Sequence, residues 1–256
     1  MKPVIYLLSD FGTADTYVAQ MKAVLLSISP NAVLVDLTHE VRPGNILQGA
    51  FHLWACREVI TKGSVVLAVV DPGVGTARNG VAALSGGNYY VGPDNGLFGL
   101  LPSAQFRLLQ NPPADSSSTF HGRDLFAPSA ARLAADPGWF RFLQPLSAEK
   151  AVPMNIQPPH AGEGSIDVTV VHVDGFGNVV LWLPPEKAEG FSPSSVILPG
   201  GKEVELSHVS TYGSNSGVLY LKGSQGCMEL AVSGGGAGAV LDLKPGDRLT
   251  LSGETV

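Results

Sequence analysis

An aspartate and an arginine lie seven residues apart in the stretch DPGVGTAR, which runs from Asp71 to Arg78. The glycines between them would allow the chain to fold back, so that the guanidinium could reach the carboxylate and favour its ionised form. Such a pair could orient a water molecule for attack on a substrate. It could equally be a structural ion pair beside an ordinary Asp-Pro-Gly turn, and the spacing by itself is compatible with either role.

A histidine that could handle a proton lies in the stretch TFHGRD, residues 119–124. His121 has a side chain that titrates near neutral pH, and Gly122 beside it leaves room for a ligand to approach. A helical pattern follows from Leu125 to Ala135. We therefore expect Asp124 to be the N-cap of this helix.

Two further carboxylates follow apolar runs. Asp10 comes directly after the run from Val4 to Ser9. A carboxylate at the end of such a strand could accept two hydrogen bonds from a vicinal diol such as a ribose, with a helix N-cap or a turn as the alternative. Asp174 begins the stretch DGFGN, which ends at Asn178 and is also compatible with a hairpin turn.

The sequence lacks several familiar site patterns. It contains neither GxxxxGK[ST], the phosphate-binding loop, nor GxSxG, the nucleophile elbow of serine hydrolases. Its six histidines form no HxH or HxxxH pair, so we expect no bound metal ion.

Charge and composition exclude further classes of function. The chain has 16 Lys and Arg against 22 Asp and Glu, a net charge of -6, with no basic cluster, so we expect no nucleic-acid partner. No apolar run approaches the roughly 18 residues that span a bilayer. The first residues do not resemble a signal peptide, and Cys56 and Cys227 lie in no CxxC motif. These features predict a cytoplasmic protein that is not bound to a membrane and whose two cysteines are buried thiols in a reducing compartment.

The first half of the chain alternates strand and helix patterns, which predicts an α/β domain with a mainly parallel central sheet. Strands are expected at Val4–Ser9, Ala32–Leu37 and Ser64–Val70, and helices at Tyr17–Ser27 and Ile46–Ile60. The first of these helices should bury a face made of Val18, Met21, Leu25 and Leu26.

The second half has a different pattern. Three Pro and two Gly in residues 153–164 predict a linker between a domain at 1–152 and a smaller one at 165–256. Short apolar runs separated by turn residues follow, with no segment of helical periodicity and helical length, which predicts an all-β barrel. The runs are Ile166–Val173, Val179–Leu183, Val196–Leu198, Val218–Leu221, Met228–Val232 and Arg248–Leu251.

Six motifs in this order resemble the family of enzymes that cleave S-adenosylmethionine, which includes the adenosyl-fluoride and adenosyl-chloride synthases. They are SDFGT (9–13), VVDPGVGT (69–76) with Arg78, GPDNG (92–96), FHGRD (120–124), DGFGN (174–178) and SQG with ELAV (224–232). The closer resemblance is to the hydroxide branch, the hydrolases that form adenosine and methionine. It covers nearly the whole chain and implies an N-terminal α/β domain, a C-terminal β-barrel and homotrimers with substrate bound between subunits.

The resemblance also implies roles for individual residues. Asp10 would bind the two ribose hydroxyls, and Asp71, Arg78 and His121 match the residues that activate water. The halogenating relatives have a tyrosine where Asp71 stands, which favours water over halide as the nucleophile. The fluoride-forming relatives have a serine where Gly122 stands, whereas chloride-forming ones resemble this chain there.

The remaining motif residues would bind the rest of the substrate. Asp174 and Ser224 would contact the amino and carboxylate ends of the methionine, Asn178 and Tyr212 the adenine, and the backbone around Val232 and Gly234 the adenine edge. Gln225 departs from an arginine found in some relatives, and this difference bears on the contact with the carboxylate. The resemblance implies no metal and no cofactor, with S-adenosyl-L-methionine as substrate and adenosine as product. A halide-dependent adenosyl transferase and a non-catalytic binder of S-adenosylmethionine or adenosine are the alternatives.

Overall fold

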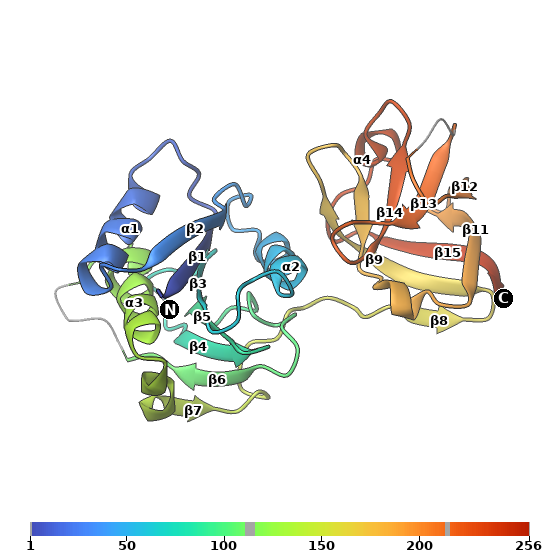
Figure 1. Ribbon diagram of the computed structural model, residues 1–256. Coiled ribbons are helices and arrows are strands. Elements are labelled where there is room, and N and C mark those ends of the chain that lie inside the picture. The colour runs from blue at the N-terminus through green and yellow to red at the C-terminus, as the bar shows by residue number, and fades with distance from the viewer. Residues whose placement is uncertain (1, 111–115, 213–215, 256) are drawn as a thin grey trace. The chain divides into compact units, whose positions relative to one another are not determined.

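The computed structural model describes residues 2–110, 116–212 and 216–255. The chain divides into two compact units, Met1–Met154 and Asn155–Val256, which Figure 1 shows in blue to green and in yellow to red. Each unit has its own hydrophobic core, and each is described here by itself.

The N-terminal unit is built on a seven-stranded sheet with the order β2-β1-β3-β5-β4-β6-β7. Its strands are β1 (Val4–Ser9), β2 (Val33–Thr38), β3 (Val65–Val69), β4 (Gly80–Ser85), β5 (Asn88–Pro93), β6 (Gln105–Leu108) and β7 (Gln144–Leu146). The expectation of a mainly parallel sheet is wrong. The pairings among β2, β1, β3 and β5 are parallel, but those among β5, β4, β6 and β7 are antiparallel, so the sheet is mixed.

A tight hairpin explains this mixed sheet. Gly86 and Gly87, with φ of 57° and 84°, form the two-residue connection between β4 and β5. A two-residue turn of this kind needs positive φ at both positions, which glycine adopts without strain. The Gly-Gly pair was therefore a usable sequence signal for an antiparallel pairing.

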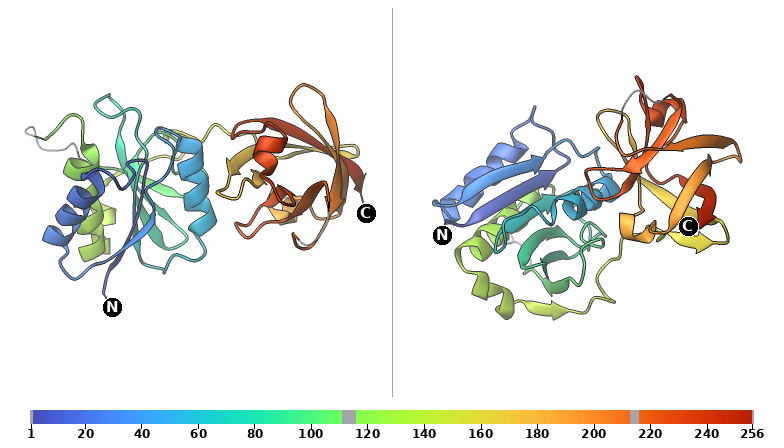
Figure 2. Two further views of the ribbon diagram at one scale, coloured as in Figure 1. Left: turned by 90° about the horizontal axis from the view of Figure 1, so that it is seen from above. Right: turned by 45° about the vertical axis from the view of Figure 1, so that its right-hand side comes forward.

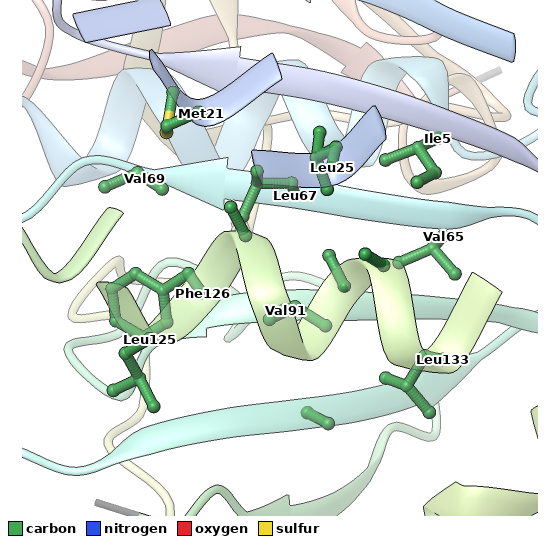
Figure 3. Packing of buried hydrophobic residues seen from close by; sticks show 14 of the residues in the cluster. Ile5, Met21, Leu25, Val65, Leu67, Val69, Val91, Leu125, Phe126 and Leu133 are labelled. Carbon is green, nitrogen blue, oxygen red and sulfur yellow. The ribbon is translucent and has the colours of Figure 1, made fainter. Parts of the chain in front are cut away.

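Helices cover both faces of this sheet (Figure 2). Helices α1 (Tyr17–Ile28) and α3 (Ala127–Ala135) pack together over one face, and α2 (Ile46–Cys56) covers the other. Figure 3 shows the first of these interfaces, where side chains of α1 and α3 meet those of β1, β3 and β5. On α1 the predicted Val18, Met21 and Leu25 are buried, but Leu26 is 41% exposed, because one further residue turns it about 100° away from the core.

The helical structure expected from Leu125 begins earlier, at Gly122. A π-helical turn, η1 (Gly122–Phe126), precedes α3, and a 3₁₀ segment, η2 (Pro137–Phe142), follows it. Asp124 therefore lies inside the helical region and is not its N-cap. Its carboxylate instead accepts hydrogen bonds from Arg123 and from the backbone N–H of Ser117.

The C-terminal unit contains a closed seven-stranded barrel. The strands β10-β14-β13-β12-β11-β15-β9 are paired in that order, and a pairing of β9 with β10 closes the ring, while β8 pairs with β9. They are β8 (His160–Gly162), β9 (Ser165–Val173), β10 (Val179–Leu181), β11 (Phe191–Ile197), β12 (Glu203–His208), β13 (Val218–Lys222), β14 (Met228–Val232) and β15 (Arg248–Thr255). The expected β-barrel is confirmed.

Short helical segments complete this unit. They are η3 (Pro185–Lys187) and α4 (Ala237–Val240). Strand β8 lies within the residues expected to form a linker, 153–164. None of the helices in the described part of the chain is long and apolar enough to cross a membrane.

Candidate active site

Asp10 and Asp71 lie at the same edge of the N-terminal sheet. Asp10 directly follows β1, and Asp71 follows β3 with one residue between. These strands are parallel neighbours, with Ser9 paired to Val69, so their carboxyl ends meet. The carboxyl edge of parallel strands is where open α/β sheets bind ligands.

Asp71 and Arg78 form the ion pair that the glycine-rich stretch predicted. The Nε of Arg78 donates to Oδ1 and Oδ2 of Asp71 at 2.9 and 3.0 Å, and its Nη2 donates to Oδ2 at 2.5 Å. Only 10% of the Arg78 side chain and 5% of the Asp71 side chain are exposed. The guanidinium also lies 5.0 Å from the centre of the Phe126 ring. Bidentate contacts of this kind fix the orientation of both groups.

His121 joins this pair through Arg78. The Nη2 of Arg78 lies 2.8 Å from the Nδ1 of His121. Because a guanidinium can only donate, Nδ1 accepts this hydrogen bond and the ring proton lies on Nε2. Burial, followed by the charge of Arg78, lowers the pKa of His121 despite the opposing charges of Asp71 and Asp124. The imidazole is therefore neutral near neutral pH.

The geometry brings together the three residues predicted to activate water. Arg78 and His121 also line a hollow of about 290 Å³, whose other lining residues include Thr76 and Leu125. The cluster thus holds a carboxylate, a guanidinium and a neutral imidazole within direct hydrogen-bonding contact, beside open space.

Asp10 is held by the loop that follows β2. Its Oδ2 accepts a hydrogen bond of 2.7 Å from the backbone N–H of Gly44. Burial raises the pKa of Asp10, and the nearby charge of Asp71 adds to this effect, while the Gly44 N–H opposes it. Hydrogen-bond donors from a bound ligand would lower this pKa and stabilise the ionised carboxylate.

A side-chain network that the sequence analysis did not identify fixes this loop. The Oγ of Ser9 lies 2.7 Å from Nδ1 of His39, and Nε2 of His39 lies 3.1 Å from Oδ1 of Asp36. The backbone N–H of Gly12 donates to the carbonyl of His39 at 2.7 Å. Because the Ser9 side chain is fully buried, this Ser-His-Asp arrangement orients the chain around Asp10 and does not offer a nucleophile. The parallel pairing of β1 with β2 brings Ser9 close to Asp36 and His39, so no local motif reveals this arrangement.

The predicted residues of the C-terminal unit surround one pocket of about 490 Å³. It is lined by Asp174, Phe176, Asn178, Tyr212, Ser224, Gln225, Glu229, Val232, Gly234 and Gly235. All six residues predicted for substrate binding in this unit are among them. Asp174 follows β9 and Asn178 precedes β10, so the stretch DGFGN forms the turn of the β9–β10 hairpin and also contributes to the lining of the pocket.

Asp174 organises the hairpin loop. Its Oδ1 accepts hydrogen bonds of 2.9 Å from the backbone N–H groups of Phe176 and Asn178, and its Oδ2 accepts one of 3.1 Å from the Asn178 amide. Phe176, by contrast, is 86% exposed at the pocket. The sequence analysis missed it, although an aromatic residue at the tip of a glycine-rich turn has no core to pack against.

Glu229 is a second side chain of the pocket lining that the sequence did not predict. It lies on β14, is 3% exposed, and accepts a hydrogen bond from the Tyr212 hydroxyl. Burial raises the pKa of Glu229, and the charge of Asp174 adds to this effect. Burial and the neighbouring Glu229 raise the pKa of Tyr212 to about 12. A glutamate inside the apolar run MELAV was the available signal, because buried carboxylates are rare without a specific role.

Metal-binding geometry is not evident in the part of the chain that the structure describes. Residues 2–110, 116–212 and 216–255 contain no group of three or more His, Cys, Asp and Glu side chains that could hold a metal ion.

Two domain families match the chain. Residues 5–139 match the SAM hydroxide adenosyltransferase N-terminal domain, and residues 168–250 match the SAM hydroxide adenosyltransferase C-terminal domain. Together these matches cover most of both structural units.

Relatives of similar length carry matching names. The chain is 40% identical to an (R)-S-adenosyl-L-methionine hydrolase from Thermus thermophilus, covering 96% of this chain and 98% of the relative. It is 37% identical to an (R)-S-adenosyl-L-methionine hydrolase from Salinispora tropica, covering 98% of both. Fluorinases are more distant, at 27% to 29% identity over at most 70% of the chain.

A solved structure agrees with the fold. The crystal structure of an uncharacterized conserved protein from Thermotoga maritima aligns with a TM-score of 0.88 and 30% sequence identity, covering 97% of this chain and 99% of that one.

Proposed function

We infer that this chain, which belongs to the S-adenosyl-L-methionine hydroxide adenosyltransferase family, hydrolyses S-adenosyl-L-methionine to adenosine and L-methionine. The observation that carries the choice of nucleophile is the Asp71–Arg78–His121 cluster. The positive charge of Arg78 is already neutralised by Asp71, and a carboxylate repels an incoming halide. The same carboxylate can accept a hydrogen bond from water. The cluster thus suits water better than an anion.

We propose an in-line displacement at C5′ of the ribose. The oxygen of water forms a bond to C5′ as the bond from C5′ to the sulfonium sulfur breaks, and the electron pair of that bond leaves with sulfur to form the neutral thioether of methionine. One proton of the water must be released. A sulfonium is a good leaving group, so we propose that the reaction needs neither a metal ion nor a cofactor.

Asp71 is the proposed acceptor of the water proton. Arg78 cannot accept a proton, and the Nδ1 lone pair of His121 is engaged by Arg78. The Nε2–H of His121 can instead donate a hydrogen bond to the attacking oxygen and fix its position. Positioned base assistance of this kind is typically worth about 10² to 10⁴-fold in rate.

The other predicted residues are proposed to hold the substrate. Asp10 would accept hydrogen bonds from both ribose hydroxyls, for which its remaining lone pairs are suited. In the C-terminal pocket, Asp174 and Ser224 would bind the methionine end, and Asn178 and Tyr212 the adenine. Backbone groups near Val232 and Gly234 would face the adenine edge. Support for the roles proposed in the C-terminal unit comes from the common lining of one pocket by these residues.

Incubation with S-adenosyl-L-methionine in ¹⁸O-water tests the nucleophile directly. We expect one ¹⁸O atom at the 5′ position of adenosine by mass spectrometry, and no 5′-chloro product when chloride is added. The relatives are named for the (R) epimer, so we propose that the (R)-sulfonium is consumed and the (S)-sulfonium is left. A chlorinated product would assign the chain to halide transfer, and binding without turnover would make it a sensor.

We also propose a homotrimer in which the two predicted halves of each site come from different subunits, as the family resemblance implies. Asp71→Asn and Asp174→Ala chains, each expected to have little activity alone, should regain activity when they are co-expressed with different tags and purified through both. In a mixed trimer, a site has both native residues when Asp71 comes from an Asp174→Ala chain and Asp174 comes from an Asp71→Asn chain. A monomeric mass in sedimentation velocity, or mixed trimers without regained activity, would contradict the shared site.

A further inference from the structure

The pocket of the C-terminal unit has an unusual charge composition for a site that would bind a zwitterionic amino acid. Two carboxylates, Asp174 and Glu229, line it, and none of the described residues around it is basic. The three residues beyond Tyr212 that lie outside the described range are Gly, Ser and Asn, which carry no charge. From the C-terminal unit, a substrate ammonium would meet side chains of opposite charge, whereas a substrate carboxylate would meet charged side chains of its own sign only.

Gln225 also lines this pocket. Its Oε1 is buried and has no hydrogen-bond partner among the described residues. A buried acceptor without a partner carries a cost that a donor from a ligand would remove. An ammonium supplies three such donors, while a carboxylate supplies none.

Glu229 is fixed in this pocket by its surroundings. The Tyr212 hydroxyl donates to its Oε1. Its Oε2 occupies the space that a Cβ at residue 223 would take, so only glycine leaves room for this carboxylate. The position of the Glu229 carboxylate in the pocket lining is therefore fixed before a ligand binds.

Lys222, the basic residue nearest to Glu229 in the sequence, lies on the opposite face of the β13–β14 ladder. Glu229 pairs with Leu221 across the β13–β14 ladder, and Lys222 pairs with Met228. Because successive residues of a strand point to opposite faces, Lys222 lies on the other side of the sheet from Glu229.

We propose that Asp174, Gln225 and Glu229 recognise the ammonium group of the substrate arm and make no favourable contact with its carboxylate. This inference rests on the proposed hydrolysis and names its substrate class: adenosyl sulfoniums whose third arm carries a terminal amine, with or without a carboxylate. The chain should therefore also hydrolyse the decarboxylated sulfonium, which bears a 3-aminopropyl arm. Its products would be adenosine and 3-(methylthio)propylamine, by the same attack of water at C5′.

Three substrates separate the contributions of the two groups. They are S-adenosyl-L-methionine, its decarboxylated analogue, and a deaminated analogue with a 3-carboxypropyl arm. We expect loss of the carboxylate to change kcat/KM by less than about tenfold. Loss of the amine should lower it by about 10- to 100-fold, the range that corresponds to losing hydrogen bonds to a charged group.

Variants assign the effect to residues. Glu229→Gln should raise KM for both amine-bearing substrates and leave the deaminated analogue unaffected or improved. Gln225→Arg should shift the preference toward S-adenosyl-L-methionine over its decarboxylated analogue by about tenfold, because it adds a partner for the carboxylate. Glu205→Gln, the same chemical change as Glu229→Gln at an exposed position of the barrel, is the matched control and should change no ratio. Unfolding temperatures of all variants report folding separately.

The outcomes distinguish this inference from the proposed function. If no compound is hydrolysed, the proposed function itself is wrong. If S-adenosyl-L-methionine is hydrolysed but the decarboxylated analogue reacts more than tenfold more slowly, the hydrolysis stands and the ammonium-only recognition is wrong. An unchanged preference in Gln225→Arg would also overturn the role assigned to that position.

Discussion

Replacing Asp71 with asparagine is expected to lower kcat by about 10² to 10⁴-fold with little change in KM. The amide keeps the shape of the side chain and one oxygen for Arg78, which donates to both carboxylate oxygens in the native protein. It removes the only member of the Asp71–Arg78–His121 cluster with a lone pair free to take the water proton. Single-turnover rates with saturating S-adenosyl-L-methionine measure the chemical step separately from product release.

The control for this variant is Asp242→Asn. Asp242 is exposed and has a φ of 52°, a conformation that asparagine tolerates as well as aspartate does. The same change of charge there should leave kcat unaltered. Asp71→Asn also weakens a buried ion pair, so circular dichroism and the unfolding temperature are needed alongside the rates. A folded Asp71→Asn protein with native kcat would refute the assignment of Asp71 as proton acceptor.

Replacing Asp10 with alanine is expected to lower kcat/KM by about 10² to 10⁴-fold, mainly through KM. Two charge-assisted hydrogen bonds to the ribose would be lost, each worth about 1.5–3 kcal/mol. The effect should depend on the sugar. The native protein should lose affinity when the 2′-hydroxyl of the substrate is removed, whereas Asp10→Ala should lose little more, because its partner for that hydroxyl is already absent.

His39→Gln supplies the companion measurement for Asp10. His39 contacts Ser9 and Asp36 and holds the loop that donates to Asp10 from Gly44. His39→Gln should lower kcat/KM less than Asp10→Ala does, because it misplaces the carboxylate without removing it. As with Asp10→Ala, the loss should be larger for the ribose substrate than for its 2′-deoxy analogue. If Asp10→Ala lowered kcat/KM by the same factor for the ribose and the 2′-deoxyribose substrates, the ribose role of Asp10 would be contradicted.

Much of the fold followed from local patterns. Helix α1 (Tyr17–Ile28) and strand β14 (Met228–Val232) were predicted within one residue at either end, because each has a clear hydrophobic period and sharp turn residues beside it. The strands of residues 80–93 were missed, although Gly86 and Gly87 mark a hairpin. Strand direction depends on which segments pair, and the pairing of β4 with both β5 and β6 turned the expected parallel sheet into a mixed one.

The sequence by itself determined the residue types at the two candidate sites. The Asp71 to Arg78 loop is short and glycine-rich, so its ion pair is nearly local, and motif order was enough to indicate the family. Only the tertiary structure decided that His121 accepts a hydrogen bond from Arg78 and that Glu229 joins Asp174 in one pocket. It also decided that Ser9, Asp36 and His39 form a network around Asp10. These contacts join residues that are distant in the sequence or lie on neighbouring strands, and their energies depend on burial and orientation that no local spacing encodes.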